Sequence, residues 1–495
     1  MVVLLSSVVA ASDPGTPAAG SPVLVPIDNS DFPAEKAWAR FTPPAPAPGS
    51  GPPVAVRVLA INDFHGRLAA AARLAGRLAQ LRTPNTITVA AGDLVGAAPL
   101  VSAAFHDEPA IRALDLAGLD LAAVGNHEFD EGVAELLRLR YGGCHPVDGC
   151  ADGTWPGAGF QYLAANVLDD AVDGPVLPPY AIEEVGGVRI GFIGITLAST
   201  PSYVTPSGVT GIRFADEVAT GNEYARRLRA QGVGAIVVLL HEGGFPSGGG
   251  IDDCAGLSGP VLPIVDGLSD DVDVIVTGHT HQAYNCVIGG RPVTGAGEYG
   301  EVVTAIDLMI DPATGEVRSA AARNVAVGDA PADAAETGLV EHYRSLLGPR
   351  ARPVVGTVPG PVGGRALATL VADAELAATR DQGAVAAFVH PDAPRAGLDA
   401  GPVTAEEALA VLPYNNYLVT LDVSGADLRA LLDQGTLVPS STVADGTPVD
   451  PAATYRITVT DLLADGGGGA DALTRGTDRV RGELDVEALS DHLSG

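Results

Sequence analysis

Five apolar segments of this chain each end in a short cluster of Asp, Asn or His residues. The segments are rich in Val, Ile, Leu and Ala, and their length is typical of buried strands. The carboxyl ends of parallel strands share one edge of a sheet, where α/β proteins place their sites. The clusters are Asn62–Gly66 after segment 54–61, Gly92-Asp93 after 86–91, Gly125–Asp130 after 119–124, His241-Glu242 after 234–240 and Gly278–His281 after 272–277. This pattern predicts an α/β domain with one polar site built from five strand ends.

The same alternation of strands and helices organises the rest of the chain. Helical spacing of Ala and Leu is clearest over 68–81, between the first two strands. A length of 495 residues favours two domains. We predict a catalytic α/β domain over 54–330, a connecting helix and linker over 331–353, and a smaller α/β domain over 354–495. Residues 13–53 are rich in Pro, Ala, Gly and Ser and are expected to form a linker or extended arm.

Seven side chains in the strand-end clusters have the chemistry of metal ligands. They are Asp63, His65, Asp93, Asn126, His241, His279 and His281. Imidazole nitrogens with carboxylate or amide oxygens suit Zn²⁺, Mn²⁺ and similar divalent ions. Seven ligands exceed the need of one ion, so two ions sharing a carboxylate is the economical arrangement. Such a pair can clamp both oxygens of an in-line phosphoryl displacement. Any one of these histidines alone would more often be a hydrogen-bonded loop residue, but their joint occurrence favours a metal centre.

A separate pair, His127 and Asp130, has the spacing of an acid–base dyad. His127 follows the proposed ligand Asn126 and need not bind metal itself. Asp130, three residues on, could hold one ring nitrogen of His127. A protonated His127 could then stabilise transition-state charge or protonate a leaving group. The remaining histidines lack such a context and are interpreted as surface or structural residues: His106, His145, His342, His390 and His492.

The charge balance limits the kinds of partner. Sixty acidic residues against 29 basic ones give a formal net charge of -31. This charge argues against a nucleic-acid duplex and against an anionic membrane surface as the main partner. It would also repel a phosphate ester, so local metal or arginine charge must compensate.

Residues 1–12 and the four cysteines indicate export. The segment MVVLLSSVVAA has the apolar stretch and small residues of a signal peptide, although a plain apolar tail is the alternative because the basic start is missing. Nearness in sequence pairs Cys144 with Cys150 and Cys254 with Cys286. Two disulfides in an oxidising compartment are favoured over free thiols or a zinc site. No further segment has the length of a transmembrane helix.

In order along the chain, the motifs DFHG, AGD, GNHEFD, LLHEGG and GHTH resemble those of the calcineurin-like metallophosphoesterases, and specifically of the secreted bacterial 5'-nucleotidase family. The resemblance covers nearly the whole chain after Val54. It implies a four-layer α/β/β/α catalytic domain, a C-terminal domain that supplies the nucleotide pocket, and rotation between the two during turnover. It also implies two ligand sets that share Asp93. One is Asp63, His65, Asp93 and His281, and the other is Asp93, Asn126, His241 and His279, with His127 and Asp130 matching the catalytic dyad.

The C-terminal domain departs from the family pattern. The family's Asn-x-Gly-Gly-Ile-Arg stretch is His390-Pro-Asp-Ala-Pro-Arg395 here, so the arginine is kept without the glycine pair. By the resemblance, Arg395 contacts phosphate, Tyr414 stacks on the base and Asn416 is a weaker candidate for polar contact with it. A second aromatic ring belongs where Ala470 stands, so we expect one ring of the base-binding pair to be missing.

The leading interpretation is a secreted, dinuclear-metal phosphoric ester hydrolase acting on nucleoside 5'-monophosphates or related nucleotides through attack of metal-bound hydroxide. The ions are expected to be Zn, Mn, Co, Mg or Ca, and the protein to be an extracellular or cell-wall-associated monomer. A 2',3'-cyclic nucleotide phosphodiesterase or a nucleotide-sugar hydrolase is the alternative within enzymes. A non-catalytic surface binding protein with a vestigial site is the alternative outside them.

Overall fold

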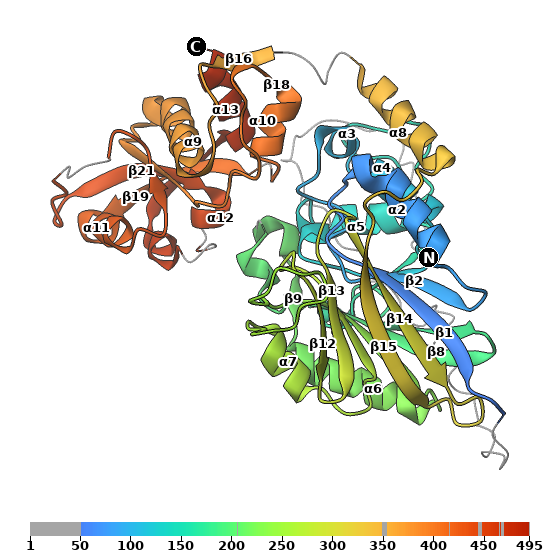
Figure 1. Cartoon of the computed structure of the whole chain (residues 1–495). Helices are drawn as coiled ribbons and strands as arrows, with labels where there is room; N and C mark the ends of the chain where they lie inside the picture. The colour runs from blue at the N-terminus through green and yellow to red at the C-terminus, as the bar shows by residue number, and fades with distance from the viewer. Residues whose placement is uncertain are drawn as a thin grey trace, which may run out of the picture.

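The computed structural model describes residues 51–204, 206–348, 354–414, 416–443, 448–464, 466 and 470–494. The signal-like segment 1–12 and nearly all of the predicted arm 13–53 lie outside the described residues. Figure 1 shows two bodies, one coloured blue to yellow and one orange to red, with α8 (Ala334–Leu347) near their junction. Within the described ranges, no helix combines the length and apolar character needed to cross a bilayer.

Two six-stranded mixed sheets form the centre of the larger body. The first has the order β15 (Val317–Ala326), β14 (Val302–Ile310), β1 (Val54–Ile61), β2 (Thr86–Ala90), β3 (Leu121–Ala123) and β4 (Gln161–Leu163). The second has the order β12 (Ala283–Ile288), β13 (Arg291–Ala296), β11 (Val274–Thr277), β10 (Ala235–His241), β8 (Val188–Thr196) and β7 (Tyr180–Val185). Strands β1 to β4 run parallel, as do β8, β10, β11 and β13.

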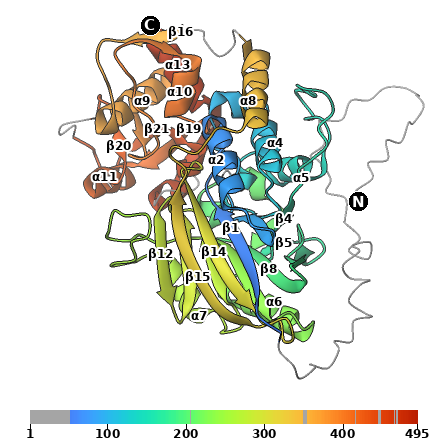
Figure 2. The same ribbon diagram turned by 45° about the vertical axis from the view of Figure 1, so that its right-hand side comes forward.

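The two sheets pack face to face, and helices cover their outer faces. Buried side chains from both sheets, among them Val58, Phe192 and Val237, form the layer between them. The helices α2 (Leu68–Leu81), α4 (Glu108–Leu116), α5 (Val133–Tyr141) and α8 contribute to the core outside the first sheet. Helices α6 (Glu217–Ala230) and α7 (Val261–Gly267) cover the second, well away from α2, α4 and α8 (Figure 2). The predicted α/β/β/α arrangement is therefore confirmed.

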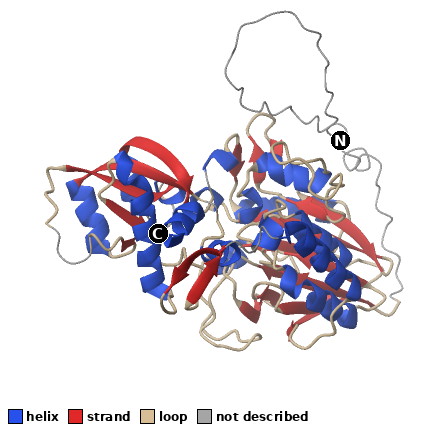
Figure 3. Cartoon of the chain, turned by 90° about the horizontal axis from the view of Figure 1, so that it is seen from above, coloured by secondary structure: helices blue, strands red, loops and turns tan. Residues whose placement is uncertain are grey.

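The C-terminal body is a separate, smaller α/β unit, as the view from above also shows (Figure 3). Its sheet has the order β20 (Val438–Pro439), β17 (Ala386–Val389), β21 (Thr454–Thr460), β19 (Tyr417–Ser424) and β22 (Thr477–Leu484). Around the sheet lie α9 (Gly364–Thr379), α10 (Ala405–Val411), α11 (Gly425–Gln434), α12 (Asp461–Ala464) and α13 (Asp485–Ser494). Strand β16 (Val354–Val358) pairs with β18 (Gly401–Thr404) beside them.

Both predicted disulfides are present. Cys144 is bonded to Cys150, which closes a seven-residue loop after α5, and Cys254 is bonded to Cys286 on β12. No cysteine is left free. Disulfides of this kind persist mainly in oxidising compartments.

Candidate active site

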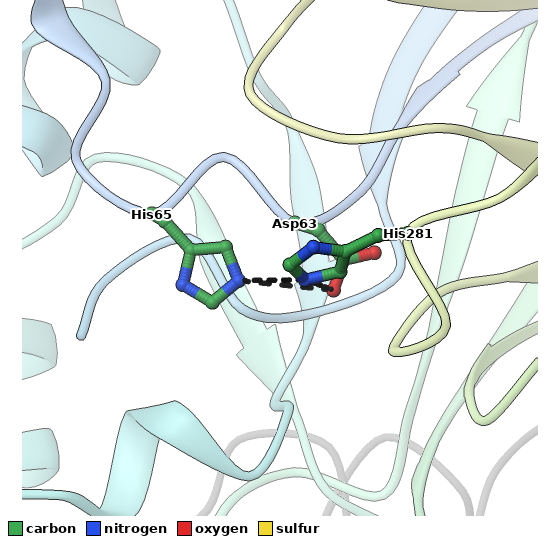
Figure 4. Close-up of side chains that lie close together, drawn as sticks. All are labelled: Asp63, His65 and His281. Atoms are coloured by element: carbon green, nitrogen blue, oxygen red, sulfur yellow. Dashed lines mark hydrogen bonds and ion pairs between the residues drawn. The ribbon is translucent and has the colours of Figure 1, made fainter. Parts of the chain in front are cut away.

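The carboxyl ends of the parallel strands bring the first group of predicted ligands together. Asp63 and His65 follow β1, and His281 precedes β12 of the other sheet. The His65 Nε2 and His281 Nε2 atoms are 3.2 Å apart, and the Asp63 carboxylate lies 3.5 Å from His281 Nε2. Figure 4 shows both imidazole rings directed at the Asp63 carboxylate. These three side chains can each offer one ligand atom to a common ion.

A second group forms next to the first and shares a carboxylate with it. Asp93 Oδ2 is 3.0 Å from His241 Nε2 in this group and 3.7 Å from His65 Nε2 in the first. The Asn126 side-chain oxygen lies 3.2 Å from His241 Nε2 and 3.0 Å from His279 Nδ1. The structure thus brings all seven predicted ligands together in two neighbouring groups linked by Asp93.

The histidines of this site are held so that one ring nitrogen of each points inward. His65 donates its Nδ1–H to the Gly96 carbonyl at 2.9 Å, and His241 donates its Nδ1–H to the Ala91 carbonyl at 2.6 Å. His281 Nδ1 pairs with the Glu298 carboxylate. The Nε2 lone pairs of His65 and His281 then face each other, which is repulsive without a cation or proton between them. This donor set, anchored through the outer ring nitrogens, fits divalent metal ions.

The backbone at the site is locally strained. The φ angles of Asp63, His65, Asp93, His279 and His281 lie between 48° and 69°. Residues other than glycine avoid this left-handed region at a cost of order 1 kcal/mol each. Strain of this kind persists where surrounding contacts force the geometry, which is typical of functional sites.

Two buried polar side chains that the sequence reasoning missed hold the ligand loops in place. Glu128 accepts backbone N–H bonds from Asp93, Leu94 and Gly125, so one carboxylate ties together the ends of β2 and β3. Asn62 donates to the Asp63 carboxylate at 2.5 Å and accepts from the Ala296 N–H at 2.8 Å. Their only sequence signal is that each is adjacent to a predicted ligand or dyad residue.

Burial and charge act against each other in this cluster. Burial raises the pKa of Asp63 to about 6 despite the nearby His241 and His281. Burial would lower the pKa of His241, but the Asp93 carboxylate outweighs it and raises that pKa to about 10. The two carboxylates therefore create a strong local demand for positive charge, which divalent ions would satisfy.

The predicted dyad is present beside the first group. His127 Nδ1 lies 2.7 Å from Asp130 Oδ2, and its ring centroid is 5.0 Å from that of His65. Burial lowers the pKa of His127, but the Asp130 and Asp93 carboxylates outweigh it and raise the pKa to about 9. A nitrogen of His127 also comes within 4.8 Å of ligand atoms of His65 and Asp93, so a ligand role is geometrically open. Since Asp130 engages Nδ1, the nitrogen left for chemistry is Nε2.

A cavity of about 460 Å³ opens over the site and is lined by both domains. This volume is in the range of small-molecule pockets. Arg395, Tyr414 and Asn416 line it from the C-terminal side, where they were predicted. The Tyr414 ring stacks on His127 with centroids 5.6 Å apart, so one face of the ring is turned toward the dyad. Asn416 donates to the Asp485 carboxylate at 3.2 Å and so is already engaged.

One expectation for the C-terminal domain is wrong. Ala470 does not stand at the cavity wall. It is 2 % exposed and packs in the domain core with Leu421 and Leu473. His390, interpreted as a surface or structural residue, lines the cavity together with Asp392. Val389, Leu462 and Leu463 also belong to this wall.

The catalytic domain contributes further cavity residues that sequence reasoning missed. The Arg67 guanidinium lies 4.1 Å from the centre of the Tyr299 ring, and Arg67 follows the first ligand cluster directly in sequence. Tyr203 and Phe245 are about half exposed and also line the cavity. Arg67 and Arg395 thus supply positive charge from opposite domains.

Comparison with known proteins agrees with this architecture. The family model for calcineurin-like phosphoesterases matches residues 56–283, and the model for the 5'-nucleotidase C-terminal domain matches residues 354–443. The crystal structure of a 5'-nucleotidase precursor from Thermus thermophilus superposes with a TM-score of 0.72 and 25 % identity, covering 89 % of this chain and 96 % of that one.

Two curated relatives match most of this chain but are longer. Endonuclease YhcR of Bacillus subtilis is 29 % identical and covers 89 % of this chain and 40 % of its own length. Cell wall protein Lmo0130 of Listeria monocytogenes is 27 % identical and covers 85 % of this chain and 64 % of its own length. This chain therefore spans less than two thirds of either relative. The two family matches, in the order of the two domains that carry the site, establish that the chain belongs to the calcineurin-like phosphoesterases with a 5'-nucleotidase C-terminal domain.

Proposed function

We propose that the protein is an exported hydrolase that releases phosphate from nucleoside 5'-monophosphates or closely related phosphate esters. The observation that carries the proposal is the position of the His127–Asp130 dyad. It lies between the two ligand groups and the wall formed by Arg395 and Tyr414, at the floor of one cavity. A phosphate ester held there would meet metal ligands, an acid and an arginine at the same time.

Each of the two ligand groups would hold one divalent ion. The first group is Asp63, His65, Asp93 and His281, and the second is Asp93, Asn126, His241 and His279. Bound ions of this type supply positive charge to phosphoryl oxygens and make water acidic enough to act as a nucleophile. His127, protonated and held by Asp130, donates a proton from Nε2 to the leaving oxygen as the phosphorus–oxygen bond breaks. Asp130 keeps the ring oriented and supports its positive charge.

The C-terminal domain would bind the remainder of the substrate. Arg395 is the phosphate contact on this side, since its guanidinium lines the cavity beside Tyr299 and Glu298. Tyr414 offers its open face to a base, and the apolar Val389 and Leu463 lie in the same wall. His390 also carries an aromatic ring in this wall, and the half-exposed Tyr203 and Phe245 line the cavity from the catalytic domain.

Export is proposed from the two disulfides together with the signal-like segment 1–12. Extracellular hydrolysis of nucleotides would serve phosphate scavenging and nucleoside salvage.

The test is a chelator-sensitive phosphate-release assay on a panel of esters. The panel contains purine and pyrimidine 5'-monophosphates, a 2',3'-cyclic nucleotide, a nucleotide sugar and 4-nitrophenyl phosphate. We expect the 5'-monophosphates to give the highest kcat/KM, with little difference between bases. A clear preference for the cyclic nucleotide or the nucleotide sugar would replace this assignment with one of those activities.

A further inference from the structure

Two aromatic side chains of the catalytic domain have no part in the chemistry proposed above. Tyr203 and Phe245 line the cavity and are 46 % and 50 % exposed. Exposing the apolar surface of a large aromatic ring to water is unfavourable, so two such rings at one cavity indicate a surface that binds a planar or apolar group.

The Tyr203 ring lies beside the second ligand group. Its centroid is 4.9 Å from that of the His279 ring, and the two planes are 81° apart, so an edge meets a face. Tyr414 stacks instead on His127, whose ring centroid is 5.0 Å from that of His65 in the first ligand group. A phosphate held at the metal centre therefore has one aromatic wall beside the dyad and another beside His279.

The loop that carries Phe245 is fixed to the body of the catalytic domain. Phe245 follows the ligand His241 by four residues. Its backbone N–H donates to the Ser258 carbonyl at 2.8 Å, and the Ser258 N–H donates to the Phe245 carbonyl at 3.0 Å. Between these two residues, Cys254 is bonded to Cys286 on β12. The ring is thus presented on an ordered support, which lowers the entropic cost of binding a ligand against it.

We propose that Tyr203 and Phe245 form a second ring-binding subsite, and that the protein also cleaves phosphodiesters with a nucleoside on each side of the phosphorus. This inference rests on the phosphoryl chemistry proposed above. The nucleoside that leaves lies against Tyr414, where His127 protonates its oxygen. The base of the nucleoside that stays on the phosphorus stacks against Tyr203 and Phe245. Since the net charge of -31 argues against a long polynucleotide, the substrate class is a dinucleoside monophosphate.

The reaction is a hydrolysis that needs no further reactant. The phosphorus–oxygen bond to the departing nucleoside breaks, and a water oxygen forms a new bond to the phosphorus. The departing oxygen takes the proton of His127, and a proton of the attacking water restores it. The products are a nucleoside and a nucleoside monophosphate, and the monophosphate is itself a substrate of the proposed phosphatase activity.

The experiment compares two diesters on the full-length, metal-loaded, disulfide-intact protein. The first joins two thymidines through their 5' oxygens, and the second is the methyl ester of thymidine 5'-monophosphate. Both have the same leaving nucleoside, but only the first has a second ring. From initial rates of thymidine release, we expect kcat/KM to be about 5- to 150-fold higher for the dithymidine diester, which is the range that stacking one base provides.

Variants then assign this ratio of kcat/KM values to the two rings. The double variant Tyr203→Ala with Phe245→Ala should remove most of the ratio, whereas Phe245→Tyr, which keeps a ring, should retain it. Both side chains are half exposed, so the double variant leaves the core intact. Tyr141→Ala is the matched control, because Tyr141 is 47 % exposed and stands outside the cavity. Tyr414→Ala should lower kcat/KM for both diesters alike, because they share the leaving nucleoside.

Three outcomes would decide the proposal. Equal kcat/KM for the two diesters, with thymidine 5'-monophosphate still hydrolysed, would overturn the second subsite and leave the proposed function standing. A ratio that survives in the double variant would also overturn it. If the protein hydrolyses none of these esters, the proposed function fails, and equilibrium binding of the two diesters decides the subsite. Equal Kd values would then overturn it, and tighter binding of the dithymidine diester that is lost in the double variant would support it.

Discussion

Removing the imidazole of His127 should separate catalysis from metal binding. The ring is 14 % exposed and its Nδ1 contacts Asp130 at 2.7 Å, so His127→Ala removes the proposed acid and leaves a small polar gap. A positioned acid is worth about 10²–10⁴-fold in rate, or about 3–5 kcal/mol of transition-state stabilisation. Asp130→Asn is milder because the amide oxygen can still accept from Nδ1. It replaces a charge-assisted hydrogen bond by a neutral one, a difference of about 1–1.5 kcal/mol, or roughly 5–10-fold in kcat.

The assay compares two leaving groups on the same variants. A nucleoside leaves as a basic alkoxide that needs a proton, whereas 4-nitrophenolate leaves readily without one. If His127 is the acid, His127→Ala should lower kcat strongly for a nucleoside 5'-monophosphate and far less for 4-nitrophenyl phosphate. The double variant with Asp130→Asn should be no slower than His127→Ala alone, because the two residues act as one unit. Metal content measured on the same samples should match the wild type.

Two results would refute this reasoning. An equal loss for both esters would show that His127 stabilises charge on the phosphoryl group and does not protonate the leaving oxygen. A fall in metal content parallel to the fall in activity would make His127 a ligand, as its proximity to His65 and Asp93 allows.

The sequence was sufficient to predict the catalytic fold and the seven side chains that it brings together, because both follow from one repeated pattern. Apolar strand cores with polar carboxyl ends specify a parallel sheet and its site together. The strand 54–61 and the helix 68–81 coincide with β1 and α2, and all seven predicted ligands lie in the two groups. The seven side chains come close together because neighbouring parallel strands, such as β1 and β2, are paired in a register that ends them side by side.

The contacts that orient the ligands could not be predicted from the sequence. His65 and His241 are held by the backbone carbonyls of Gly96 and Ala91, and a carbonyl carries no information about residue type. Glu298, which holds His281, lies in a loop after β13 whose path depends on the packing of both sheets. Such partners are visible only once the tertiary structure is known.

The wall supplied by the C-terminal domain was the least predictable part of the site. Its residues reach the cavity through loops and through the placement of one domain against the other, neither of which has a periodic signal. Ala470 shows the consequence: alignment to a family pattern put it at the wall, but its small side chain packs beside Leu473 in the core. An aromatic ring there would overfill that core, so Ala470→Phe is not a test of base stacking.

Three further predictions address the metals, the base and the buried charge. Chelation should abolish phosphate release until Mn²⁺, Co²⁺ or Zn²⁺ is restored. Asp93→Asn should lower the metal occupancy of both ligand groups because the Asp93 carboxylate lies between them. His342→Asn should change the metal occupancy of neither group. Tyr414→Ala should raise KM for nucleotides by about 5- to 150-fold, since stacking on one ring is worth about 1–3 kcal/mol, but should not raise it for a phosphate ester of an aliphatic alcohol, which has no ring to stack. Tyr417→Ala, whose ring packs on Arg481, should change neither KM. The last concerns Glu336, which is 1 % exposed, has no hydrogen-bond partner for either carboxylate oxygen among the described residues, and has its pKa raised by burial to about 8. The folded protein therefore holds a proton on Glu336, whereas the unfolded chain releases it near the ordinary pKa of 4.5. The contribution of Glu336 to the free energy of unfolding is therefore complete below pH 4.5 and is lost as the pH rises through about 8. Glu336→Gln keeps the shape but cannot ionise, so its melting temperature should exceed that of the wild type at pH 9 and the two should converge at pH 4. A difference in melting temperature that is the same at both pH values would show that folding does not raise the pKa of Glu336.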